Sequence, residues 1–145
     1  MKRNSRGFTL VEILIVVIIL GILAAIVIPQ FTNASNDARN NSVASTLQTM
    51  RSQVELFKIH HADTPPAATA LNTVMTGKTN PTDTTQTAAT GTLGPYLQQF
   101  PTNPVNGFNT VVNAAGTAAG WVYTVNGGTY TLSATNTTGT ATLTY

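Results

Sequence analysis

The chain has 145 residues, a length that leaves room for one small domain, and its formal net charge is +2. Three of its seven lysines and arginines lie in the first six residues, so the remainder carries four basic against five acidic side chains. The chain has no cysteine, and it has no Asp, Glu, Lys, Arg or His from Thr84 to Tyr145. Without cysteine the chain cannot form a disulfide. Without charged side chains or histidine, residues 84–145 lack the groups needed for acid–base catalysis and for electrostatic binding of phosphate or nucleic acid.

Residues 8–29 form an apolar run in which Glu12 is the only strongly polar side chain. A helix rises about 1.5 Å per residue, so this run reaches the roughly 30 Å thickness of a bilayer core. A charged side chain inside such a helix costs roughly 2.5 to 3.5 kcal/mol at the bilayer centre and less near an end. The run predicts a transmembrane helix, and Glu12 is its candidate functional residue.

The sequence RGFTLVE at residues 6–12 follows a short basic stretch and opens the apolar run. This arrangement resembles the prepilin-type N-terminus shared by bacterial type IV pilins and type II secretion pseudopilins. The resemblance implies an α+β pilin fold, in which a long N-terminal helix packs against a small C-terminal domain with an antiparallel sheet. It also implies that residues 1–7 are a leader peptide.

The resemblance assigns roles to three positions. A prepilin peptidase would cut between Gly7 and Phe8 and would methylate the new amino group of Phe8. Glu12 would pair with that amine in a neighbouring subunit and set the axial register of a filament. The physics is consistent with this, because an acid left alone in lipid is penalised whereas one beside a neighbour's cation is compensated.

Gly21 and Pro29, two residues that weaken helices, lie within the apolar helix. Proline lacks a backbone donor and crowds the carbonyl four residues earlier, so we expect a kink before Pro29. The resemblance implies that residues 22–28 lose helicity on assembly.

Two other interpretations fit an apolar N-terminal run. The core of a Sec signal peptide is usually about 7 to 15 residues long and ends at a small-residue site. Here the run is longer, it contains Glu12, and Ala24 and Ala25 are followed by Ile-Val-Ile. The second interpretation is an ordinary single-pass anchor in which Glu12 reaches the membrane interface. Both leave the complete prepilin-type motif unexplained.

Residues 30–62 should continue the helix as an amphipathic half. Residues 32–42 are rich in Asn and Ser, which weaken a helix. Beyond them, apolar residues and one histidine recur at spacings of four and three and so form one stripe along the helix. This stripe should pack against the C-terminal domain, residues 63–145. Its members are Val43, Leu47, Met50, Val54, Phe57 and His61, and Arg51, Glu55 and Lys58 lie off it.

Two adjacent histidines lie near the predicted end of this helix, before Pro65 and Pro66. Side chains of consecutive helical residues project about 100° apart, so His60 and His61 cannot hold one metal ion from one face. We interpret them as surface or helix-capping histidines. Calcium sites of secretion-type pseudopilins use acidic residues near the C-terminus, and none follows Asp83 here. We expect no metal and no cofactor.

The next segments are short. Residues 67–75 predict a short helix, and the Thr-rich residues 77–91 predict an exposed loop. Residues 94–111, which begin GPYL and contain three prolines, resemble the connector between helices and sheet in secretion-type pseudopilins. The resemblance places Tyr96 and Leu97 beneath the sheet.

The C-terminal part alternates apolar residues with threonine, which predicts a three-stranded antiparallel sheet. A tight turn fits either Asn126-Gly127 or Gly127-Gly128, so the register stays open, although both turns put Tyr123 and Tyr130 on one face. The apolar face should cover the helix stripe and leave a threonine face outside. The apolar members are Trp121, Tyr123, Val125, Tyr130, Leu132, Ala134, Ala141, Leu143 and Tyr145.

These features predict a non-enzymatic subunit of a helical filament, the type II secretion pseudopilus. The connector, the compact sheet and the missing cysteines favour it over the alternative, a type IV pilus for adhesion, motility or DNA uptake. A membrane-anchored or secreted binding domain is the alternative of another class. The resemblance implies as partners further copies of the chain, the prepilin peptidase, an inner-membrane platform protein and an assembly ATPase.

The basic residues of the leader give the expected topology. They indicate a single-pass protein of the inner membrane whose C-terminal domain lies outside the cytoplasm. After assembly it would be part of a periplasmic or extracellular filament.

Overall fold

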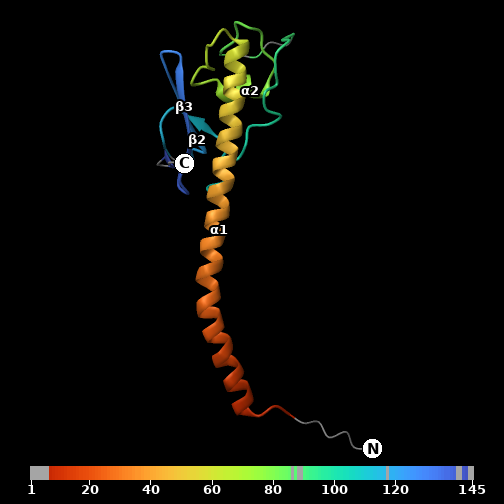
Figure 1. The fold of residues 1–145 in the computed structure, drawn as a ribbon, viewed down its shortest axis with the longest axis vertical. Coiled ribbons are helices and arrows are strands. Elements are labelled where there is room, and N and C mark those ends of the chain that lie inside the picture. The colour runs from red at the N-terminus through yellow and green to blue at the C-terminus, as the bar shows by residue number, and fades with distance from the viewer. Residues whose placement is uncertain (1–6, 86, 88–89, 117, 140–141, 144–145) are drawn as a thin grey trace, which may run out of the picture. The chain divides into compact units, whose positions relative to one another are not determined.

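The computed structural model describes residues 7–85, 87, 90–116, 118–139 and 142–143. Leader residues 1–6, and Ala141 and Tyr145 of the predicted third strand, lie outside the described residues. The elements are helices α1 (Leu10–His60) and α2 (Leu71–Thr76), and strands β1 (Val111–Val112), β2 (Trp121–Asn126), β3 (Thr129–Thr135) and β4 (Thr142–Leu143). Figure 1 labels the two helices and the strands β2 and β3, and the predicted α+β class is confirmed.

The chain divides into two compact units, Met1–Ala38 and Arg39–Tyr145. The first unit holds the N-terminal part of α1, and the second holds the rest of α1 and all the other elements. Helix α1 is 51 residues long and includes Pro29 without interruption. The expected kink before Pro29 stays a prediction.

Helix α1 ends at His60, slightly before the predicted end at residue 62. Ala62 and Asp63 adopt left-handed backbone conformations, with φ of 51° and 58°. The Asp63 N–H donates to the Lys58 carbonyl at 2.9 Å and satisfies one of the helix's last acceptors. The chain then turns away before the prolines that follow.

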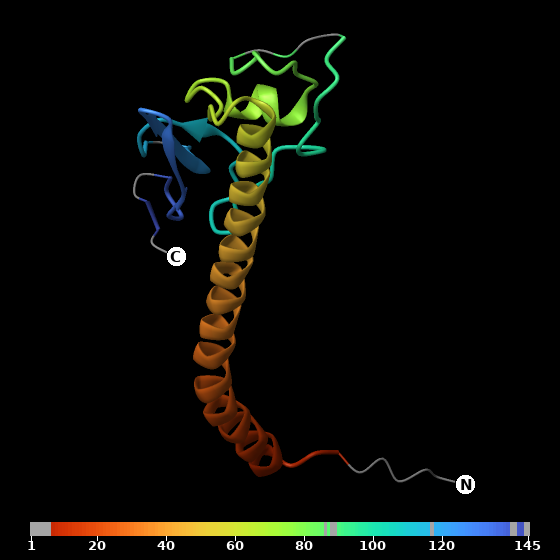
Figure 2. The ribbon, with the colours of Figure 1, turned by 45° about the horizontal axis from the view of Figure 1, so that its top comes forward.

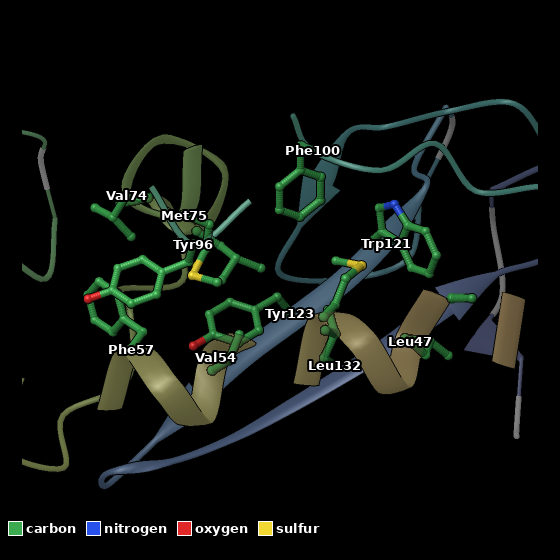
Figure 3. Packing of buried hydrophobic residues seen from close by; sticks show 14 of the residues in the cluster. Leu47, Val54, Phe57, Val74, Met75, Tyr96, Phe100, Trp121, Tyr123 and Leu132 are labelled. Carbon is green, nitrogen blue, oxygen red and sulfur yellow. The ribbon is translucent and has the colours of Figure 1, made fainter. Parts of the chain in front are cut away.

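The predicted stripe on α1 is confirmed as the helix side of the core. Its members have exposed fractions of only 0–1%; they are Val43, Leu47, Met50, Val54, Phe57 and His61. The sheet covers them with Trp121, Tyr123 and Leu132, as Figure 3 shows. Figure 2 shows β2 and β3 beside the C-terminal part of α1. Burial of large apolar side chains at about 1.5 to 3 kcal/mol each holds the sheet on the helix.

Among the described residues the sheet has four strands in the order β1-β2-β3-β4. Strands β2 and β3 form an antiparallel hairpin in which Asn126 pairs with Thr129. Gly127 and Gly128 form the turn with φ of 54° and 85°, values that favour glycine, so this turn is the one that sets the register. The rings of Tyr123 and Tyr130 lie 5.7 Å apart on the same face, as predicted.

The predicted all-antiparallel arrangement of three strands is wrong in one respect. Strand β1 pairs with β2 in parallel, which makes the sheet mixed. It has only two residues, too few to show an alternating pattern. The N–H groups of Gly120 and Trp121 donate to the Thr110 carbonyl just before β1, each at 3.0 Å. Gly120 is required there, because a Cβ would lie 2.3 Å from the Phe108 carbonyl oxygen.

The outward face of the hairpin is mostly threonine, as expected. Thr124 and Thr131 are cross-strand neighbours whose hydroxyl oxygens lie 2.6 Å apart. Two residues of this face are nevertheless buried, Val122 at 7% and Thr135 at 0% exposed. The Thr135 hydroxyl donates to the carbonyls of Ala119 and Gly120, so the loop before β2 covers that end of the sheet.

The connector is held by two asparagines. Asn103 is fully buried, and its amide nitrogen donates to the carbonyls of Gly120 and Thr135 at 2.8 and 3.0 Å. The Asn106 amide nitrogen donates to the carbonyls of Ala119 and Asn136 at 2.9 Å each. These bonds tie the connector to the start of β2 and the end of β3. The alternation of apolar residues with threonine in the sequence did not predict them.

The first part of the connector packs differently from the prediction. The N–H groups of Tyr96 and Leu97 donate to the Met75 carbonyl at 2.9 and 2.8 Å. The Tyr96 ring meets the ring of Phe57 edge to face, with centroids 5.3 Å apart. Tyr96 therefore lies between the end of α1 and α2, and the expected position beneath the sheet is wrong. Helix α2 itself is shorter than predicted, because residues 67–70 form a turn.

Alkaline pH should destabilise this fold through two tyrosines. Burial, followed by hydrogen bonding with Glu55 and the charge of Glu55, raises the pKa of Tyr130 to about 12. Burial also raises the pKa of Tyr123, whose hydroxyl donates to the Pro66 carbonyl at 2.9 Å. A tyrosine with a raised pKa stabilises the folded state fully below its unfolded pKa of about 10, and this stabilisation is lost as the pH rises toward 12. Denaturation midpoints should fall over that interval, and less steeply in Tyr130→Phe. A flat profile would contradict the assignment.

Candidate functional site

The first unit exposes a continuous apolar surface. Every large apolar side chain from Phe8 to Phe31 is at least half exposed, with values from 51% to 82%. Patches of this size are not left in water by soluble proteins. Within the described part of the chain, α1 alone has the length and composition to cross a membrane. This surface requires either lipid or other protein around it.

The Gly7–Phe8 bond lies just before the helix. Both residues are exposed, and neither has helical hydrogen bonding, since α1 begins at Leu10. Exposed segments next to a chain terminus are the usual sites of proteolysis, so the position of this bond is compatible with the predicted cleavage. The predicted cleavage site and the predicted helix are therefore adjacent without overlapping.

Glu12 closes a reciprocal cap at the start of α1. Thr9 donates its backbone N–H and its hydroxyl to Glu12 Oε2, both at 2.8 Å. The Glu12 N–H in turn lies 3.3 Å from Thr9 Oγ1, which accepts its hydrogen. This is a capping box, with Thr9 as the N-cap and Glu12 as the third helical residue. The carboxylate is thus held at the start of the helix, four residues after Phe8 of the predicted cleavage site.

Gly21 and Pro29 lie inside α1. A Cβ at Gly21 would meet no atom within 4 Å, so nothing in the described part of this chain demands glycine there. Pro29 lacks an N–H, so the Ala25 carbonyl loses its usual helical donor. The Thr32 hydroxyl donates to the Ile28 carbonyl at 3.1 Å in the next turn. Loss of helicity over residues 22–28 stays a prediction.

Comparison with known proteins places these features in a family. Residues 2–28 match the prokaryotic N-terminal methylation motif. The type II secretion system core protein G of Klebsiella michiganensis is 30% identical over 106 residues, which is 73% of this chain and 72% of that protein. The chain belongs to the type II secretion system core protein G family.

Two further core protein G relatives support this assignment. The Pseudomonas aeruginosa protein is 30% identical over 103 residues, 71% of this chain and 70% of the relative. The Dickeya chrysanthemi protein is 29% identical over 104 residues, 72% of this chain and 65% of the relative. The matched part of the chain thus spans about two thirds of the length of these core G proteins. No solved structure matches the chain.

The two histidines of this core protein G family member have different environments. His60 is exposed and its Nδ1 lies 3.0 Å from the Tyr96 hydroxyl. His61 is buried, its ring stacks on Phe57 with centroids 3.7 Å apart, and its Nδ1–H donates to the Phe57 carbonyl at 2.8 Å. His61 is therefore not a surface histidine, because it belongs to the buried stripe, but its bond to the Phe57 carbonyl does cap the last turn of α1. In the described ranges no cluster of His, Cys, Asp and Glu side chains could hold a metal ion.

Sequence reasoning did not assign a role to Thr9. The pattern T-x-x-E at the start of an apolar helix is a recognised signal for a capping box, and it is present at residues 9–12. In this core protein G chain the prepilin-type motif therefore also encodes the start of the helix.

Replacing Thr9 by valine should fray the first turn of α1. The change removes both hydroxyl contacts while keeping the shape and the Glu12 charge, and loss of an N-cap costs about 1 kcal/mol. Amide hydrogen exchange in detergent micelles should therefore quicken at residues 10–13 alone. Thr9→Ser, which retains a hydroxyl, should exchange like the parent. Equal protection in the valine variant would show that the cap is not formed in solution.

Proposed function

We propose that this chain is a structural subunit of the type II secretion pseudopilus, released from its leader by cleavage between Gly7 and Phe8. The subunit waits in the inner membrane with α1 as its single span and its C-terminal domain outside the cytoplasm. It then joins a helical filament in which the apolar part of α1 is surrounded by other copies. Membership in the core protein G family supports this assignment.

The observation that carries the proposal is the position of Glu12. It is the one carboxylate on an otherwise apolar, exposed segment, and it lies four residues after Phe8. In the free subunit Thr9 supplies its hydrogen bonds but no compensating charge. Once the leader is removed, the amino group of Phe8 on another copy can supply that charge. A pair of opposite charges in an apolar surrounding is favourable, whereas an unpaired charge is costly.

This arrangement makes assembly specific. Apolar surface alone would let helices associate in any axial register, because burial is not directional. A single acid that must meet a single amine selects one offset between neighbouring copies. The proposed partners are therefore further copies of the chain, the prepilin peptidase that creates the amine, and the platform protein and ATPase that move subunits out of the membrane.

The N-terminus of the mature protein tests the proposal. The chain, recovered from cells that contain a prepilin peptidase, should begin at Phe8 and carry one methyl group on its amine, as read by mass spectrometry of the N-terminal peptide. A start near Ile26 would indicate a conventional signal peptide. An intact leader would indicate a plain membrane anchor, and either result would refute the proposal.

A further inference from the structure

A cleft of about 460 Å³ lies between α1 and β3, two elements that lie side by side in Figure 2. Helix α1 contributes Arg51, Glu55 and Lys58 to its walls, and β3 contributes residues 129–132. Pockets that hold small ligands have volumes of roughly 300 to 1,000 Å³, so the cleft is large enough for a ligand. The chemistry of its two walls indicates which kind of ligand fits.

The β3 wall of the cleft is an open strand edge. Strand β3 pairs with β2 along its whole length, whereas β4 pairs with it only at residues 134–135 among the described residues. Thr129 pairs with β2 directly after the turn, so its backbone groups and those of every second residue point toward β2. The backbone groups of Tyr130 and Leu132 point the opposite way, and the Leu132 carbonyl accepts from Arg51 Nη2 at 2.7 Å.

The α1 wall carries the charges that the sheet lacks. Arg51 and Lys58 are two helical turns apart on one side of α1 with Glu55 between them, so the cleft has a net charge of +1. Lys58 Nζ lies 3.3 Å from Glu55 Oε2 and 5.9 Å from the centre of the Tyr130 ring. Arg51 forms no ion pair with any described residue. Its bond to the Leu132 carbonyl holds the guanidinium at the cleft, and a guanidinium has five N–H donors.

We propose that this cleft binds an extended acidic segment of another protein. The main chain of the segment pairs with the β3 edge at Tyr130 and Leu132, and its carboxylate binds the Arg51 guanidinium. The seven residue steps from Arg51 to Lys58 cover about 10 Å, which is the length of about three extended residues. The inference goes beyond the proposed function and does not depend on it.

A strand from a second copy of this chain does not have the required chemistry. Residues 84–145, which include the four described strands, contain no acidic side chain. Asp83, the acid that comes just before them, accepts the Asn80 N–H at 2.8 Å within its own loop. A free carboxylic acid could meet the guanidinium but would leave the strand edge unpaired. A peptide segment of another protein satisfies both walls.

Peptide titration of the full chain in detergent micelles tests the inference. The probe is the pentapeptide Thr-Val-Glu-Val-Thr with blocked ends, and the measurement is two-dimensional NMR of the backbone amides of Tyr130 and Leu132. Both amides should shift and saturate with a dissociation constant on the order of 1 mM or below. The same peptide with glutamine in place of glutamate should bind roughly fivefold more weakly. A peptide methylated on its main-chain nitrogens should not bind.

Two substitutions change the charge of the cleft in opposite directions. Arg51→Gln should weaken binding of the glutamate peptide roughly fivefold, whereas Glu55→Gln, which removes a competing acid, should strengthen it about twofold. Lys78→Gln, at an exposed lysine outside the cleft, is the matched control and should bind like the parent. Because Arg51 and Glu55 are exposed, the denaturation midpoints should stay near that of the parent.

Four outcomes would overturn the inference. They are the absence of saturable shifts up to about 10 mM peptide, equal binding of the glutamate and glutamine peptides, undiminished binding of the methylated peptide, and equal binding to Arg51→Gln and the parent. Shifts of the same size with N-acetylglutamate alone would indicate a site for small acids and would overturn it as well. All these titrations use the unassembled chain, so their failure would leave the proposed function standing.

Discussion

Filaments should disappear when Glu12 is replaced by valine, while the chain still inserts into the membrane and loses its leader. Valine removes the only charge of the apolar segment, so insertion becomes easier and no register is preferred over another. Glu12→Gln separates the two roles of this residue. Glutamine can still accept the hydrogen bonds of Thr9 and close the cap, but it cannot neutralise an amine.

The expected order of filament yield follows from that separation. Both Glu12 variants should yield few or no filaments, whereas Thr9→Val, which keeps the charge, should retain most of its yield. Electron microscopy and immunoblots of sheared filaments measure the yield, and membrane fractionation measures insertion. Normal filaments from Glu12→Gln would show that the carboxylate acts only as a cap, and the pairing role would be refuted.

The C-terminal domain should lose most of its stability when Trp121 is replaced by alanine. Trp121 is fully buried against the α1 stripe, and its Nε1–H donates to the Pro101 carbonyl at 2.9 Å. Truncation of a buried Trp to Ala costs about 3 to 5 kcal/mol, a large part of the roughly 5 to 15 kcal/mol that stabilises typical domains. The change also leaves the Pro101 carbonyl without this donor.

Denaturant unfolding of the full chain in detergent, followed by near-ultraviolet circular dichroism of the tyrosines, measures this loss. Thr131→Ala, on the exposed face of β3, is the control and should shift the free energy of unfolding by no more than about 0.5 kcal/mol. An unchanged midpoint in Trp121→Ala would show that the sheet is not held through this side chain. Subunits with the alanine substitution should still be cut at the proposed site between Gly7 and Phe8, because these two residues belong to the other unit.

The features that the sequence predicted well are those written as local patterns. The stripe from Val43 to His61 has helical spacing, and Trp121, Tyr123 and Leu132 alternate as a strand requires. These periods depend only on backbone geometry, so they hold whatever the rest of the chain does. The prepilin-type motif is equally local, because the residues that define it lie within a few positions of the predicted cleavage bond.

The features that were missed depend on contacts between distant segments. Strand β1 is too short to have a period, and its parallel partner is fixed by Gly120 and Thr110. Tyr96 could not be placed from sequence, because its backbone N–H bonds to the carbonyl of Met75 in α2, and the position of α2 is set by the tertiary fold. The side-chain amide of Asn103 donates to carbonyls that lie 17 and 32 residues further along the chain, and no spacing in the sequence predicts these bonds.

Electron microscopy of cells that produce this chain together with a prepilin peptidase, a platform protein and an assembly ATPase tests the proposed assembly. We expect filaments that are labelled by an antibody to the C-terminal domain and composed of chains that begin at methylated Phe8. Correctly trimmed and methylated chains that remain dispersed in the membrane, with every assembly component present, would contradict it.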